Sequence, residues 1–84
     1  MAGPRGRILI VDDEANARTA LADLLRDEGY SIETAADGSK ALPKLDDFQP
    51  ELVLTDLKMP GMDGLDLLRK AREMDPETAA VVMT

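Results

Sequence analysis

Two short apolar runs in this chain each end in acidic residues. Residues 8–11 (ILIV) lead into Asp12 and Asp13, and residues 52–55 (LVLT) lead into Asp56. Such runs favour strands that are buried on both faces, as in parallel sheets. Ligands of these sheets bind beyond the carboxyl ends of the strands, so the three carboxylates would meet at one edge. Their mutual repulsion would require a cation, which predicts a divalent-metal site with one carboxylate available for chemistry.

The residue types narrow the chemistry of this site. Carboxylate oxygens are hard ligands that suit Mg²⁺, which also binds phosphate oxygens. The sequence contains no histidine and no cysteine, which excludes catalysis by Ser-His-Asp or Cys-His groups. Asp56 is the candidate for the reacting group, since a carboxylate can attack phosphorus to form an acyl phosphate. Thr84, at the end of a later apolar run, could bring a hydroxyl group to the same edge.

Each of these residues also has a simpler interpretation. The sequence 12–14 (DDE) could be no more than the start of a helix, where acidic residues cap free amides and offset the helix dipole. Asp56 could cap the loop that follows it, and Thr84 could be an ordinary strand residue of high β-propensity. The acidic residues converge only if the two strands that carry them are neighbours in the sheet.

The hydrophobic pattern predicts strands and helices in alternation. Predicted strands cover residues 7–11, 31–35, 52–55 and 79–84, and predicted helices cover residues 15–28, 39–47 and 64–74. Right-handed crossovers make this β-α-β-α-β-α-β order an α/β fold with a doubly wound parallel sheet.

The predicted helices carry apolar faces and two exceptional residues. The expected inward-facing residues are Ala17, Leu21, Leu24 and Leu25 in the first helix, Ala41, Leu42 and Leu45 in the second, and Leu67, Leu68, Ala71 and Met74 in the third. Gly29 is expected to end the first helix in a left-handed conformation. Pro43 predicts a second helix that is short, kinked or late to start.

Composition limits the remaining possibilities. A chain of 84 residues forms at most one small domain, and a net charge of −7 argues against direct binding of nucleic acid. Neither a secretory signal nor a membrane-spanning run is present in the sequence, so a cytoplasmic protein is expected. Residues 1–6, which contain glycine and proline, are predicted to be a flexible tail.

The acidic motifs resemble those of the receiver (CheY-like) domain of bacterial two-component response regulators. Residues 8–14, 52–64 and 81–84 carry the resemblance, which covers nearly the whole chain from Arg7 onward. It implies one partial receiver domain over residues 7–84, with a flavodoxin-like sheet in the order 2-1-3-4. Residues 54–68 most resemble receivers of transcription activators, which implies a role in transcription regulation.

The resemblance also implies a role for each candidate residue. Asp56 would accept a phosphoryl group from the phosphohistidine of a sensor histidine kinase. Mg²⁺ would be bound by Asp13 directly, by Asp12 mostly through water, by Asp56 and by the backbone carbonyl of Lys58. Thr84 would be the switch hydroxyl that moves toward the phosphate.

The sequence departs from the family pattern after Thr84. Receivers continue through a fourth helix, a fifth strand and a fifth helix, and the fifth strand ends near a lysine that pairs with the phosphate. Neither Lys58 nor Lys70 can be assigned that role. We therefore expect weak or absent phosphorylation of these 84 residues, and an open edge at the fourth strand. If ordered alone, the chain is expected to form a homo-oligomer or to be completed by a partner.

The leading function is thus a phosphoacceptor signalling module that controls its own output domain or a downstream protein, rather than an independent enzyme. One alternative is a receiver fold that is not phosphorylated and serves as an assembly module. A Mg²⁺-dependent phosphatase with an aspartyl nucleophile is disfavoured, because such enzymes use a second acid two residues later, where this chain has Lys58.

Overall fold

The computed structural model of the protein describes residues 6–56, 64–74 and 78–83, with the backbone alone described at 56, 64–68 and 80–83. Its elements follow in the order β1 (Arg7–Val11), α1 (Ala15–Asp27), β2 (Ser31–Ala35), α2 (Gly38–Phe48), β3 (Leu52–Asp56), α3 (Gly64–Met74) and β4 (Ala79–Met83). The predicted tail falls outside the described residues except for Gly6, as does Thr84 at the end of the last predicted strand.

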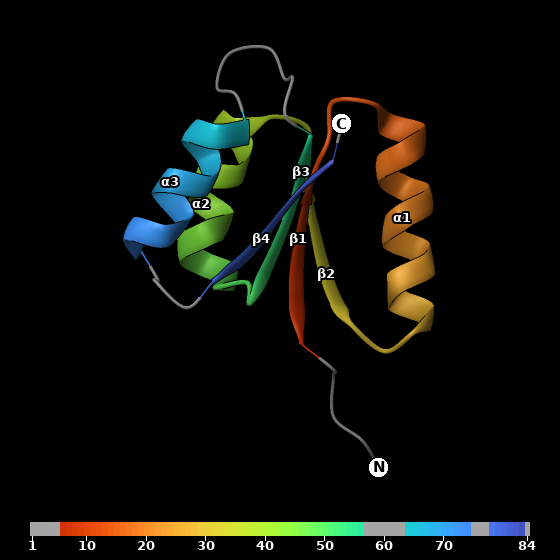
Figure 1. Ribbon diagram of the computed structural model, residues 1–84. Helices are drawn as coiled ribbons and strands as arrows, with labels where there is room; N and C mark the ends of the chain where they lie inside the picture. Colours follow the sequence, from red (N-terminus) through yellow and green to blue (C-terminus); the bar gives the residue numbers. More distant parts are fainter. Residues whose placement is uncertain (1–5, 57–63, 75–77, 84) are drawn as a thin grey trace.

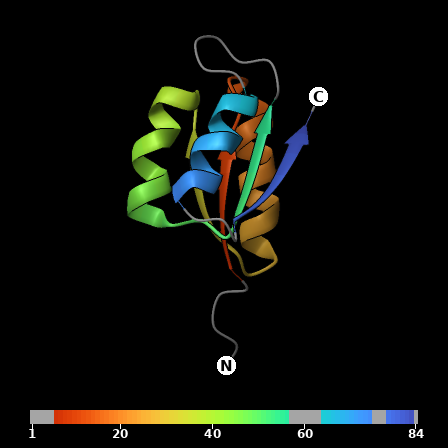
Figure 2. The same ribbon diagram turned by 60° about the vertical axis from the view of Figure 1, so that its left-hand side comes forward.

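The strands form one parallel sheet in the order β2-β1-β3-β4, which confirms the predicted α/β fold and strand order. Helix α1 lies on one face of the sheet, and α2 and α3 lie side by side on the other (Figure 1). The rotated view in Figure 2 shows the same three-layer arrangement. No described helix is long and apolar enough to cross a membrane.

Alternating side chains of the central strands fill two separate cores. On the face of α2 and α3, the buried residues are Leu9, Val11, Ala35, Ala41, Leu45, Val53 and Ala71. On the face of α1, they are Ile8, Ile10, Ala22 and Ile32, with Leu21, Leu25, Tyr30, Leu52 and Leu54 packed at the border. Strands β1 and β3 therefore supply apolar groups to both faces, as the unbroken apolar runs predicted.

Helix α1 ends as its sequence predicts. Gly29 has a φ of 99°, in the region that glycine adopts without steric cost. Its N–H donates to the Arg26 carbonyl at 3.0 Å, and the Tyr30 N–H donates to the Leu25 carbonyl at 3.2 Å. This pair of bonds is a Schellman motif, and Leu25 and Tyr30 border the same core.

The apolar face predicted for α1 is partly wrong. Leu21 and Leu25 border the core as expected, whereas Ala17 is exposed and Leu24 is 60% exposed. The helix instead buries Ala22, whose small side chain allows the helix to approach the sheet closely. In α3, Ala71 is buried as predicted but Met74 is 49% exposed.

Helix α2 does not start late. It begins at Gly38, one residue before the predicted start, because the Asp37 carboxylate caps it by accepting a 2.8 Å hydrogen bond from the Lys40 N–H. Pro43 lies inside the helix, beyond its first turn. The expected buried residues Ala41 and Leu45 lie in the core, with Leu42 packed against it. Tertiary packing and the cap thus outweigh the cost of the proline.

Candidate functional site

The register of the sheet brings the two acidic strand ends together. Strands β1 and β3 are parallel neighbours in which Val11 pairs with Thr55, so Asp12 and Asp56 follow at the same level. Asp56 in turn pairs with Met83 at the end of β4. The carboxyl ends of these strands lie at one edge of the sheet (Figure 1). The predicted convergence of the acidic residues is confirmed at the level of the backbone.

Asp12 is held at this edge by three hydrogen bonds. Its N–H donates to the Ala35 carbonyl of β2 at 3.1 Å, which extends the strand pairing past the end of β1. Its carboxylate Oδ1 accepts from the Glu14 N–H at 2.9 Å. Its backbone carbonyl accepts from Nη1 of Arg18, in the first turns of α1, at 2.7 Å. The segment between β1 and α1 is therefore anchored from both sides of Asp12.

The three acidic residues after β1 differ in their contacts. Glu14 is the N-cap of α1, and its carboxylate accepts from the Asn16 N–H at 3.1 Å. Asp12 is half-buried, and Asp13 is exposed and forms no hydrogen bond or ion pair within the described part of the chain. The capping interpretation therefore holds for Glu14, and the Asp12 carboxylate accepts from the N–H of this cap residue, while the Asp13 carboxylate is exposed to solvent.

The donor set fits Mg²⁺ in its chemistry. The structure brings two carboxylates and the backbone of a third acidic residue to one solvent-exposed edge, and carboxylate oxygens are ligands that Mg²⁺ prefers. Among the residues with described side chains, no group of three or more acidic residues could hold a metal ion, and Asp56 is not in that set. Lys58 and Thr84 lie outside the described residues.

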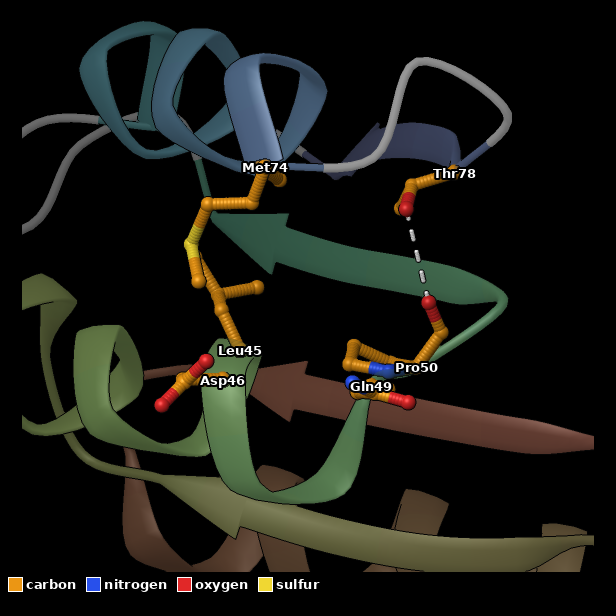
Figure 3. A pocket seen from close by; sticks show the side chains of 7 residues that line it. Leu45, Asp46, Gln49, Pro50, Met74 and Thr78 are labelled. Atoms are coloured by element: carbon orange, nitrogen blue, oxygen red, sulfur yellow. Dashed lines mark hydrogen bonds between the residues drawn. The ribbon is translucent and has the colours of Figure 1, made fainter.

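A cavity lies at the opposite edge of the sheet. It has a volume of about 200 Å³ and lies between the carboxyl ends of α2 and α3, near Pro50 and Thr78, which precede β3 and β4 (Figure 3). Thr78 Oγ1 donates to the Pro50 carbonyl across it at 3.5 Å. None of its lining residues is a predicted site residue, so the acidic edge remains the candidate site.

Among the described residues at this edge, sequence reasoning missed Arg18, whose side chain contacts Asp12. Its only sequence signal is its position one turn inside a helix that follows an acidic pair. Its side chain is partly buried and reaches back to Asp12. Its partner is a backbone carbonyl, which every residue has, so the sequence does not indicate this interaction.

Comparison with known proteins identifies the family. Residues 8–84 match the family described as the response regulator receiver domain. The chain belongs to the response regulator receiver family. This match spans all three motifs in which the sequence resembles receivers, and it confirms the family assignment made from them.

Relatives of the receiver chain include longer proteins. It is 40% identical over 78 residues to sporulation initiation phosphotransferase F of Bacillus subtilis, covering 93% of this chain and 63% of that protein. It is 44% identical over 68 residues to the DNA-binding response regulator MtrA of Mycobacterium tuberculosis, covering 81% of this chain and 30% of MtrA. The chain thus spans less than two thirds of the length of these relatives.

A solved structure supports the fold of this receiver directly. The response regulator TrrA of Thermotoga maritima, crystallised in complex with Mg²⁺ and BeF, superposes with a TM-score of 0.80 at 40% identity. The match covers 92% of this chain and 65% of TrrA.

Proposed function

We propose that this receiver is a phosphoacceptor module of a two-component system, in which Asp56 receives a phosphoryl group from the phosphohistidine of a sensor histidine kinase. The observation that carries the proposal is the register of β1 and β3, which sets Asp12 and Asp56 at one level on neighbouring strands. We assign residues 7–84 to the receiver domain and residues 1–6 to an N-terminal tail.

The reaction would transfer a phosphoryl group from the histidine of the kinase to Asp56. A carboxylate oxygen of Asp56 attacks phosphorus and forms an acyl phosphate, while the phosphorus–nitrogen bond to the kinase histidine breaks. Asp12, Asp13, Asp56 and the backbone carbonyl of Lys58 would hold Mg²⁺, and Thr84 would supply the switch hydroxyl. Bound Mg²⁺ would neutralise charge on the transferring group. The crystallisation of TrrA in complex with Mg²⁺ and BeF supports Mg²⁺ as the metal of the proposed site.

The module would act through other proteins rather than as an independent enzyme. The presence of DNA-binding regulators among its relatives supports an output in transcription regulation, through an attached output domain or a downstream protein. We propose a cytoplasmic location, where a sensor kinase would reach it. Among the described helices, α1 alone covers its face of the sheet (Figure 1), and Leu52 and Leu54 are only partly buried there. This partly covered face supports completion by further polypeptide, a partner or a second copy.

Labelling at Asp56 tests the proposal. The 84-residue chain would be incubated with acetyl phosphate and MgCl₂, and the adduct measured by intact-mass spectrometry with hydroxylamine as a probe for acyl phosphate. We expect at most a slow, substoichiometric adduct that requires Mg²⁺, because residues 1–84 offer no lysine assigned to the phosphate. The adduct should be lost in Asp56→Asn and kept in Asp47→Asn, a charge-matched change on the exposed surface of α2.

The assembly-module alternative predicts a different result. It is favoured by the partly covered face beside α1, which needs no phosphoryl chemistry. Under this alternative, the chain would bind neither Mg²⁺ nor beryllofluoride, while sedimentation would show stable association. That combination would contradict the phosphoacceptor proposal.

A further inference from the structure

We infer that Arg18 is a positioning residue of the acidic site, which fixes the Asp12 carboxylate by bonding to the backbone of the same residue. This inference rests on the proposed function, because it assigns a role toward the metal site proposed there. Arg18 would not touch the metal or the phosphoryl group. It would act entirely through the geometry of the segment between β1 and α1.

The contact itself is short and charge-assisted. Nη1 of Arg18 lies 2.7 Å from the Asp12 carbonyl oxygen, and the side chain is partly buried. Charged donors form hydrogen bonds that are about twice as strong as neutral ones. Within the described residues, Arg18 forms no ion pair with either carboxylate, so its interaction with the site runs through the carbonyl.

The position of the bond explains what it would control. The Asp12 carbonyl belongs to the peptide unit that joins Asp12 to Asp13, so holding it fixes the direction in which the chain leaves β1. The Asp12 N–H is fixed separately by the Ala35 carbonyl of β2. Because both backbone groups of Asp12 are held, its carboxylate stays hydrogen-bonded to the Glu14 N–H. The same constraint on the chain keeps the Asp13 carboxylate exposed to solvent.

Two physical effects of Arg18 have opposite signs, and this makes the inference testable. A cation near the site repels Mg²⁺, so removing its charge alone would tighten metal binding. Loss of a group that orients metal ligands weakens binding, by 10–100-fold in typical sites. The positioning role therefore predicts weaker binding on removal of a positive charge, which simple electrostatics cannot produce.

The test compares Arg18→Met, Arg18→Lys and a control, Arg26→Met, in the full 84-residue chain. Arg26 lies near the other end of α1 and also donates to a backbone carbonyl, that of Ile32 at 3.3 Å. Arg26→Met thus removes the same charge and a similar bond, far from the acidic edge. Mg²⁺ affinity would be measured by NMR titration of the Asp13 and Glu14 amides.

We expect Mg²⁺ to bind about tenfold more weakly to Arg18→Met, at the low end for such groups, and nearly unchanged to Arg26→Met. Arg18→Lys keeps a cationic donor and should recover part of the affinity. Equal or tighter binding in Arg18→Met would overturn the inference.

A second measurement needs no metal. Hydrogen exchange of the Glu14 amide, which donates to Asp12 Oδ1, should be several-fold faster in Arg18→Met, while the amides of β3 keep their protection and show that the fold is intact. Unchanged Glu14 exchange would overturn the positioning role. If the unchanged protein binds no Mg²⁺ but Glu14 exchange responds as expected, the metal site fails and the positioning role stands.

Discussion

The ammonium group of Lys44 donates a hydrogen bond to the carbonyl oxygen of Thr34 at a distance of 2.6 Å. Thr34 lies in β2, an edge strand whose residues 31 and 35 bond to Gly6 and Asp12 at the two ends of β1, and alternate residues of a strand bond to the same side. The Thr34 and Ile32 carbonyls therefore point outward, and Arg26 Nη2 donates to the Ile32 carbonyl at 3.3 Å. Two cationic side chains, one from a helix on each face, thus cover the outward carbonyls of β2. Such covering blocks pairing with another chain.

Replacing Lys44 should weaken this protection. We expect Lys44→Met to lower the free energy of unfolding by about 1 kcal/mol, because the bond is charge-assisted but its side chain is partly exposed. The double variant with Arg26→Met should also associate more strongly, as measured by sedimentation velocity over a range of concentrations. Lys40→Met is the control for charge on the same helix. The protective role is contradicted if the double variant remains as monomeric as Lys40→Met.

Pro43 should cost stability, since it lies in α2 beyond the first turn and cannot donate a backbone hydrogen bond. Proline in a helix interior lowers the free energy of unfolding by about 3 kcal/mol relative to alanine. Proline also restricts the unfolded chain, which raises the free energy of unfolding by up to about 1 kcal/mol. We expect Pro43→Ala to stabilise the protein by about 1–2 kcal/mol in urea denaturation. A destabilised Pro43→Ala variant would show that the proline is adapted to its place in α2.

Gly29 should resist substitution because its φ of 99° disfavours any side chain. We expect Gly29→Ala to destabilise the fold by about 1–2 kcal/mol, the cost of a left-handed conformation for a residue with a Cβ atom. Thermal unfolding followed by circular dichroism would measure the change. Glu28→Ala, at the exposed neighbouring position, should alter the midpoint much less. Similar midpoints for the two variants would argue against strain at Gly29.

Asp13 should differ from other exposed acidic residues in its effect on Mg²⁺ binding. We expect Asp13→Asn to weaken Mg²⁺ binding by at least about tenfold, since it removes a proposed direct ligand. Asp46→Asn, an equal change of charge on the exposed surface of α2, should leave binding nearly unchanged. Calorimetric titration of both variants provides the measurement. If both variants weakened Mg²⁺ binding equally, the loss of affinity would be explained by net charge and Asp13 would not be a specific ligand.

Much of the fold could be predicted because the apolar runs of β1 and β3 favour strands that are buried on both faces. The bounds of β1, β2 and α3 agree with their predictions, and the strand ends that carry Asp12 and Asp56 are neighbours, as expected. The exposure of Leu24 could not be predicted, because helical spacing defines an apolar stripe without fixing which flank meets the sheet. Arg18 was missed for a related reason, since its partner is a backbone carbonyl that any residue could provide.

The central position of β1 has a consequence for how the chain is made. It lies between β2 and β3, and its register with β3 pairs Ile8 with Leu52, a residue that follows 44 positions later. At about 5–20 residues per second, a ribosome needs roughly two to nine seconds to add that length. During this interval β1, in which residues 8–11 are buried in the finished fold, lacks its second neighbour. The nascent chain would therefore depend on the β1-α1-β2 unit, or on a chaperone, to cover β1 until β3 emerges.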